Sequence, residues 1–394
     1  MISPFLNTIR TSDYIIVLIA LFMFAFMPTS SAGIMFDTRS ILIIWIFTFG
    51  YLIYLVVNNT IEAKSAIISF LIILYMTFAT VISTDTYMQF SIARLGPVLT
   101  VMILFNIKFK RILPFKYMMF LLEFICWTII IWNLLLLFQN LSMIDFTNNN
   151  YTQFYEYATS YSILQLKPVM TFGVHTFSSF FYFLIFSLCY FNIKKTKYSL
   201  KRFYIYMIFL FIYNILLFSS TSLIFSSIMI IMFVSLTKKL SSKSIIIAIS
   251  FIAIFLFFQS ELYFKYSSMI FSESNGFLPR YTEDSVFTEN YKILSESILG
   301  IGFNIARNDN LSYTDSGYIV YLTMGNIIFM IGLYYLLFRF LSNNLNAYFI
   351  YPVFLTIMLF EFAIPIVLYI KFFYMIIFFV MYLKSLDFAF PNTQ

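Results

Sequence analysis

The sequence predicts an all-α, polytopic integral membrane protein with about 12 transmembrane helices. Of the 394 residues, 61% are hydrophobic and 10% are charged, whereas a soluble domain has roughly 25% charged residues. The apolar residues form long continuous runs rather than alternating with a period of two, and in lipid only helices or closed barrels satisfy every backbone polar group. The basic residues gather in short segments between alternate runs. These observations exclude a soluble enzyme and a disordered chain.

The apolar runs define the predicted helices. A helix needs about 20 apolar residues to cross the hydrocarbon layer, with roughly 17–25 as the usual range. Runs that meet or approach this length lie at 13–28, 41–57, 65–82, 91–107, 115–138, 172–193, 203–219, 221–236, 244–259, 317–341, 346–363 and 365–383. The first run is expected to stay as a helix, because Asp13 and few positive charges flank it, unlike a cleavable signal peptide. We expect one membrane domain over residues 1–394.

The basic residues predict the orientation of these helices. Three clusters stand out: Lys108, Lys110, Arg111 and Lys116, then Lys194, Lys195, Lys197, Lys201 and Arg202, then Lys238, Lys239 and Lys243. All three fall on one face if twelve helices alternate, which places both termini in the cytoplasm. Two long loops, 139–171 and 260–316, then lie outside, and loops of this length usually carry function or are disordered.

The second long loop has the pattern of an ordered segment. Thr282 is suited to cap a helix with two acidic residues in its first turn, which favours the helix dipole. Apolar side chains recur at helical spacing from Phe287 to Ile298, and Gly300 ends the pattern. We expect a short amphipathic helix on the outer membrane surface.

Charged residues at membrane depth are costly and mark candidate sites. Four fall inside predicted helices: Arg94, Glu123, Glu361 and Lys371. The loops add three outer cations: Lys167, Arg280 and Arg307. Together the cations predict a pocket for phosphate, which arginine binds through its planar fork. The alternative is that Arg94 and Lys371 extend to the interface while Glu361 pairs with one of them.

Two further polar residues stand at the ends of predicted helices. His175 is either a structural hydrogen-bonding residue or a general base. Asp315 is either an N-cap or a group that contacts a substrate hydroxyl. One His and two Cys cannot form a tetrahedral Cys/His zinc site. Because Cys126 and Cys189 lie in apolar runs, we expect two buried thiols rather than a disulfide.

Three segments resemble one family. They are Gly300-Ile301-Gly302-Phe303-Asn304, then Thr314-Asp315-Ser316-Gly317-Tyr318 followed by a helix with Gly325, and Lys167-Pro168 leading to Phe172-Gly173-Val174-His175. In topology and in these motifs the chain resembles the Wzy-type O-antigen polymerases, which join oligosaccharide repeat units in bacteria. It departs from them where Lys167 replaces a common arginine, where the turn at 219–222 lacks an arginine, and where Ile328 and Phe329 occupy the region of a second glycine.

The resemblance implies a metal-independent glycosyltransferase in the multi-helix fold of lipid-dependent glycosyltransferases. A glycan on undecaprenyl pyrophosphate would pass to a sugar hydroxyl of a lipid-linked repeat unit, on the periplasmic face of the bacterial inner membrane. Arg280, His175 and Asp315 are the expected catalytic residues, with Glu283 as a third candidate base. The expected substrate-binding residues are Arg94, Lys167, Arg307, Lys371 and Tyr318. No cofactor, metal or nucleic acid is expected; membrane lipid, a flippase and a chain-length regulator are the implied partners.

Two other functions stay open at this point. An O-antigen ligase uses the same donor and also has a long outer loop with basic residues. A sugar transporter or repeat-unit flippase is less consistent with the sequence, because transporters generally have two similar halves with a midplane site between discontinuous helices. Here the loops are asymmetric and no repeat between the halves is visible.

Overall fold

The computed structural model describes residues 10–27, 38–83, 88–151, 168–173, 175–196, 201–217, 219–236, 297–306 and 316–391. The chain divides into two compact units. Unit 1 comprises Met1–Phe24, Asp37–Leu113 and Arg280–Lys384, and unit 2 comprises Ala25–Phe36, Pro114–Pro279 and Ser385–Gln394.

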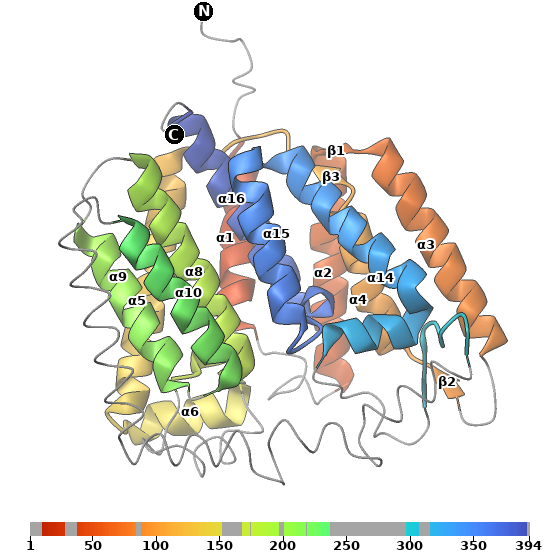
Figure 1. Cartoon of the computed structure of the whole chain (residues 1–394), viewed down its shortest axis with the longest axis horizontal. Coiled ribbons are helices and arrows are strands. Elements are labelled where there is room, and N and C mark those ends of the chain that lie inside the picture. Colours follow the sequence, from red (N-terminus) through yellow and green to blue (C-terminus); the bar gives the residue numbers. More distant parts are fainter. Residues whose placement is uncertain are drawn as a thin grey trace, which may run out of the picture. The chain divides into compact units, whose positions relative to one another are not determined.

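Unit 1 is a set of helices with a small antiparallel sheet near each end of α3 (Figure 1). Its helices are most of α1 (Thr11–Phe26), α2 (Thr38–Asn58), α3 (Ala63–Ile82), α4 (Ile92–Leu104), α14 (Gly317–Asn344), α15 (Ala347–Glu361), the 3-10 helix η5 (Ile366–Leu368) and most of α16 (Ile370–Ala389). Strand β1 (Thr60–Ile61) precedes α3 and pairs with β3 (Ile107–Lys108), whereas β2 (Met88–Phe90) follows α3 and pairs with β4 (Asn304–Ala306). The two sheets therefore mark opposite ends of this unit.

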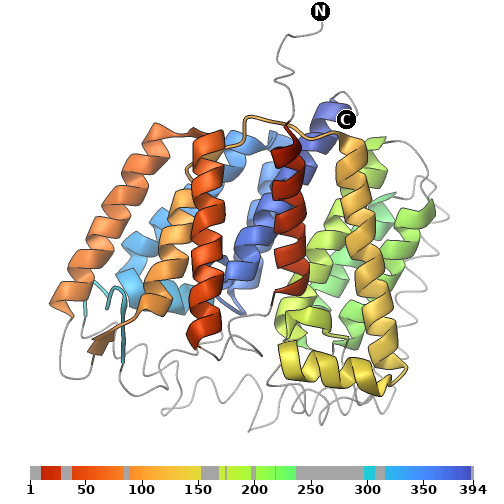
Figure 2. The same cartoon turned by 180° about the vertical axis from the view of Figure 1, so that it is seen from behind.

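Unit 2 is built around a fully packed helix, α8 (His175–Thr196), whose side chains are buried on all sides. Helices α9 (Lys201–Leu216), α10 (Ser220–Leu236) and α5 (Phe115–Leu137) pack against it. Figure 2 shows α6 (Leu141–Tyr151) running across one end of α5. Trp132 of α5 donates a hydrogen bond to Thr147 of α6 at 3.1 Å. Part of the predicted first long loop is thus helical, and a 3-10 turn, η2 (Met170–Phe172), follows later in the same range.

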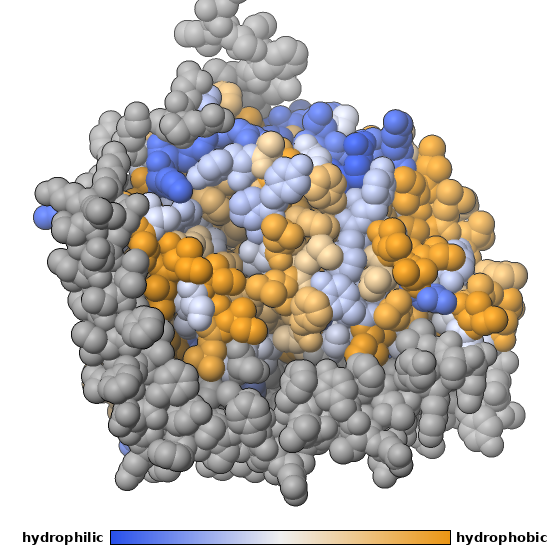
Figure 3. Space-filling view, in the orientation of Figure 1, coloured by the Kyte–Doolittle hydropathy of each residue, from blue (hydrophilic) through white to orange (hydrophobic). Residues whose placement is uncertain are grey.

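The helical prediction holds for the described residues. Each predicted helix that falls on them is helical, while 244–259 lies outside them. Five of the described helices are long and apolar enough to cross a membrane: α3, α5, α8, α14 and α16. On α3, large apolar side chains such as Phe70 and Val81 are 65% and 68% exposed, and apolar surface is widespread in Figure 3. The chain is mostly helical, as expected of an all-α membrane protein, and the twelve spans stay a prediction.

Two predicted helices differ from those observed. The run 317–341 was expected as one helix, but α14 is interrupted at Gly325 (φ −152°, ψ 31°) and Asn326 (φ 52°, ψ −164°), and Figure 1 shows two pieces meeting at an angle. The last helix begins at Ile370 rather than at 365, because the chain from Pro365 forms η5 first. Lys371 therefore lies in the first turn of α16, not about six residues inside a helix.

Ion pairs join separate segments of the chain within each unit. In the part of the chain that the structure describes they are Arg111–Asp13 (2.7 Å), Arg339–Glu62 (2.7 Å), Lys195–Asp387 (3.1 Å) and Arg202–Glu123 (2.9 Å). Glu123, one of the four charges expected at membrane depth, is thus paired with a cation of the predicted cytoplasmic side. The other pairs each join two residues that the predicted alternation of helices places on one side.

Candidate functional site

The motif Gly300–Asn304 lies within a segment, residues 297–306, that we name the glycine loop. It fills the interruption of α14. The Ile301 N–H donates to the carbonyl of Thr323 at 3.0 Å, and the Gly302 N–H donates to that of Met324 at 2.7 Å. In an unbroken helix, each of these carbonyls would accept a hydrogen bond from the N–H four residues later, and a break in the helix removes that donor. The glycine loop therefore completes the hydrogen bonding of α14 where its sequence stops being helical.

Both glycines of the loop are required by this contact. Gly300 and Gly302 have φ of +79° and +61°, which side chains rarely adopt. A Cβ at Gly300 would lie 2.6 Å from the Met324 carbonyl oxygen, and a Cβ at Gly302 would meet the α3 backbone at Met76 and Thr80. Only a residue without a side chain lets the loop approach both helices.

Polar groups at the end of α3 hold the glycine loop in place. The Phe303 N–H donates to the Thr80 hydroxyl at 2.8 Å. The buried Asn304 amide donates to the Thr80 carbonyl at 2.8 Å and to the Ser83 hydroxyl at 3.0 Å. Ser83 in turn donates to the Ile301 carbonyl at 3.0 Å. The sequence analysis missed Thr80 and Ser83, although two polar residues ending an apolar run were a usable signal.

Arg94 joins this site from the first turn of α4. Its Nη1 donates to the carbonyl oxygen of Asn304 at 2.8 Å, next to the point where Phe90 of β2 pairs with Asn304 of β4. Arginine has five N–H donors. Within the described residues, the bond to Asn304 engages only Nη1 of the half-buried Arg94 guanidinium. The structure thus brings together one predicted intramembrane cation and the motif segment.

The start of α14 is organised by a buried carboxylate. Glu361, at the end of α15, is fully buried. Its two oxygens share the Tyr321 hydroxyl proton, at 2.8 and 3.0 Å from the phenol oxygen, and it also accepts from the Val367 N–H at 3.0 Å. A Cβ at Gly317 would collide with this carboxylate. The glycine of the second motif is therefore explained by packing against Glu361, and Tyr321 is a further residue that the sequence analysis missed.

Two other predicted binding residues lie in unit 1. The Tyr318 hydroxyl donates to the Met358 carbonyl at 2.7 Å, and its ring packs against Phe362 with centroids 4.8 Å apart. Tyr318 thus joins α14 to α15 in this structure. Lys371 is 1% exposed at the beginning of α16.

His175 belongs to unit 2, where it is the half-buried first residue of α8. The chain before it turns at Gly173 with φ of +77°. The Tyr182 hydroxyl donates to the Pro168 carbonyl at 2.5 Å, which ties this turn to the body of α8. The prediction that His175 stands at the mouth of a helix is confirmed.

Several predicted residues lie outside the described part of the chain: Lys167, Arg280, Glu283, Arg307 and Asp315, together with most of the expected amphipathic helix. The two cysteines are free and buried as predicted, with their Sγ atoms 3.8 Å apart. Among the described residues, no group of three His, Cys, Asp or Glu side chains is placed to hold a metal ion.

Comparisons of the chain with protein-family models, with curated proteins and with solved structures give no match.

Proposed function

We propose that this chain polymerises lipid-linked oligosaccharide repeat units, as the Wzy-type enzymes that it resembles do. In this reaction a hydroxyl oxygen of the acceptor sugar attacks the anomeric carbon of the donor glycan. The bond from that carbon to undecaprenyl pyrophosphate breaks, and the pyrophosphate leaves with the electron pair. The hydroxyl proton passes to a base. The protein has to position two lipid-tethered reactants and stabilise the negative charge that develops on the leaving group.

The observation that carries the proposal is the hydrogen bond from Arg94 to Asn304. It connects an arginine in the first turn of an apolar helix, α4, with the motif on which the resemblance rests. Guanidinium groups bind phosphate oxygens in pairs and stay charged at any physiological pH. Donors of Arg94 that Asn304 does not use are suited to the pyrophosphate of a lipid-linked donor.

The other roles follow the chemistry of the side chains. We propose Arg280 for stabilising the leaving group, and His175 or Asp315 as the base. Lys167, Arg307 and Lys371 would add positive charge for the pyrophosphate, and Tyr318 would line the substrate site. No role requires a metal or a cofactor. The proposed site faces the periplasm of a bacterial inner membrane, and the repeat unit would reach it from a flippase.

The interruption of α14 favours a transporter, because transporters bind substrate at discontinuous helices. In such proteins the freed backbone groups coordinate the substrate or an ion. Here the carbonyls of Thr323 and Met324 are occupied by the glycine loop. The break is therefore filled by the chain itself, which favours a fixed scaffold over a transport site.

Deletion of the gene in its native strain tests the proposal and separates the candidates. A polymerase predicts loss of the polysaccharide ladder and accumulation of single-repeat glycolipid. Accumulation of fully polymerised lipid-linked glycan would instead indicate a ligase, and repeat units retained on the cytoplasmic leaflet would indicate a flippase. Either result would overturn the proposal.

Complementation with variants tests the proposed cations. We expect Arg280→Ala to abolish polymer at unchanged protein abundance. Arg94→Gln keeps an N–H donor for the Asn304 carbonyl but removes the charge, so loss of polymer in this variant would indicate that the charge itself is used. The exposed Lys201 at the start of α9 supplies the control, and Lys201→Ala should leave the ladder unchanged. Normal ladders with Arg280→Ala would contradict the assigned role.

A further inference from the structure

One end of unit 1 carries an excess of positive charge around the small sheet of β1 and β3. The cations there are Arg10, Lys64, Lys108, Lys110, Arg111, Arg339 and Lys384. Two carboxylates accompany them, those of Asp13 and Glu62. Figure 3 shows hydrophilic residues gathered at this end, above apolar surface.

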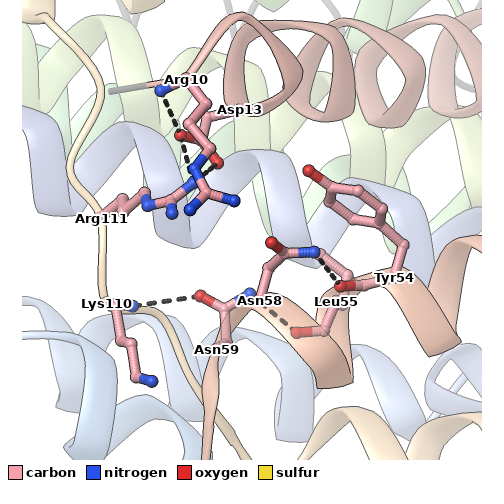
Figure 4. Close-up of polar contacts among 8 residues, drawn as sticks. All are labelled: Arg10, Asp13, Tyr54, Leu55, Asn58, Asn59, Lys110 and Arg111. Atoms are coloured by element: carbon pink, nitrogen blue, oxygen red, sulfur yellow. Dashed lines mark hydrogen bonds and ion pairs between the residues drawn. The ribbon is translucent and has the colours of Figure 1, made fainter. Parts of the chain in front are cut away.

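Inner cations neutralise both carboxylates. Arg111 donates from Nη1 to the two oxygens of Asp13 at 2.7 and 2.8 Å, and the backbone N–H of Arg10 donates to the same carboxylate at 2.8 Å (Figure 4). Arg339 donates to Glu62 at 2.7 Å. These pairs leave no acidic side chain of this group for the outer cations.

Four exposed cations surround these pairs: Arg10, Lys64, Lys108 and Lys110. None of the four forms an ion pair with the residues that the structure describes. We name them the cationic rim. Within the described part of the chain no carboxylate pairs with them, so an anion bound there displaces none of the carboxylates described at this end.

The backbone fixes two members of the cationic rim. Thr60 pairs with Lys108 across the sheet, and the Lys110 N–H donates to the Asn59 side chain at 3.1 Å (Figure 4). Along 107–110 burial alternates, because Ile107 and Phe109 are buried while the two lysines are exposed. Alternation of this kind directs Lys108 and Lys110 to the same outer face.

The cationic rim lies directly beside surface suited to lipid. Val57 in the last turn of α2 is 76% exposed, Ile61 of β1 is 48% exposed, and Ile67 in the second turn of α3 is 61% exposed. Lys64 is one helical turn from Ile67. Cations at the edge of an apolar, lipid-exposed belt lie at the depth of lipid phosphates.

We propose that the cationic rim is a binding surface for the phosphate groups of anionic phospholipids. Clustered lysines beside membrane helices attract anionic headgroups, and each adds about fivefold to affinity. The inference needs only that this end of unit 1 meets a membrane surface, and it is independent of the proposed glycan chemistry.

The test uses the purified full-length protein in a neutral detergent, titrated with phosphatidylglycerol or with phosphatidylcholine of the same chains. Native mass spectrometry counts bound lipid, and thermal unfolding reports the stabilisation. We expect phosphatidylglycerol to bind more tightly than phosphatidylcholine. Replacement of two lysines by Lys108→Gln/Lys110→Gln should weaken phosphatidylglycerol binding by about 25-fold.

A matched control removes two exposed lysines of unit 2 with Lys116→Gln/Lys201→Gln, which should retain the preference for phosphatidylglycerol. Inorganic phosphate at the same concentration separates a headgroup site from a free-phosphate site, and we expect it to leave the unfolding temperature unchanged. Equal binding of both lipids, equal losses in the two double variants, or full stabilisation by inorganic phosphate would each overturn the proposal.

Discussion

Replacement of Gly302 by alanine tests whether the glycine loop is held by close backbone contact. At φ of +61° an alanine pays about 1–2 kcal/mol for the left-handed conformation. Its Cβ would also meet the backbone of Met76 and Thr80. If the loop stays in place, overpacking adds about 1–3 kcal/mol. If it moves away, the carbonyl of Met324 loses the Gly302 hydrogen bond, which costs about 1–3 kcal/mol for a buried group.

Both responses lead to a loss of about 2–5 kcal/mol in the free energy of unfolding. The assay is denaturation of the detergent-solubilised protein followed by circular dichroism, combined with limited proteolysis mapped by mass spectrometry. We expect Gly302→Ala to unfold more easily and to be cleaved within 297–306.

Gly50 provides the matched control in the same unit. It lies inside α2, and a Cβ there would meet nothing within 4 Å. Gly50→Ala should therefore be neutral or stabilise by about 0.5–1 kcal/mol, as for an exposed helical position. If Gly302→Ala matched Gly50→Ala in stability and kept the loop resistant to protease, the reasoning about close contact would be refuted.

Two further predictions concern polar groups of unit 1. Tyr321→Phe removes the phenol hydrogen bond that the two oxygens of the buried Glu361 share, and it should lower the free energy of unfolding by about 1.5–3 kcal/mol. The exposed Tyr335→Phe serves as control, and equal effects of the two variants would contradict the role of the phenol. Hydrogen bonds from Ser65, together with the Arg339 ion pair, lower the pKa of Glu62 below its usual 4.5. The charged Glu62 side chain therefore stabilises the fold above about pH 4.5, and this stabilisation is lost as the pH falls through the folded-state pKa. Melting temperatures measured from neutral to acid pH should therefore fall more steeply for the native chain than for Glu62→Gln, and parallel curves would show that this carboxylate contributes nothing to acid sensitivity.

The helices were predictable because burial in lipid demands long apolar runs, and such runs are visible without any knowledge of packing. The interruption of α14 was not predictable in this way. Gly325 and Asn326 lie within a continuous apolar run, and a helix often tolerates a glycine. At the break, the N–H groups of the glycine loop replace the missing helical partners of the Thr323 and Met324 carbonyls. That contact joins segments more than twenty residues apart.

The candidate site was predictable in its residue types and not in its contacts. A cation at Arg94 and a carboxylate at Glu361 stand out because charge at membrane depth is costly. Their partners do not stand out: Arg94 donates to a backbone carbonyl, and Glu361 accepts from a phenol and a backbone N–H. Backbone groups carry no sequence signature, so only their placement in space identifies them.

The sequence by itself determined that the chain is mostly helical and of membrane type, and it located the polar residues that such a protein has to accommodate. These properties depend on the hydrophobicity of each stretch of chain, which can be read from the residues without knowing how they pack. The tertiary structure alone decided which polar groups meet. It paired Glu123 with Arg202, placed Gly317 against Glu361, and joined Arg94 to the glycine loop. A hydrogen bond forms only when the distance between its two atoms is correct to within a few tenths of an ångström. Where the two atoms belong to separate helices, only the packed fold sets that distance.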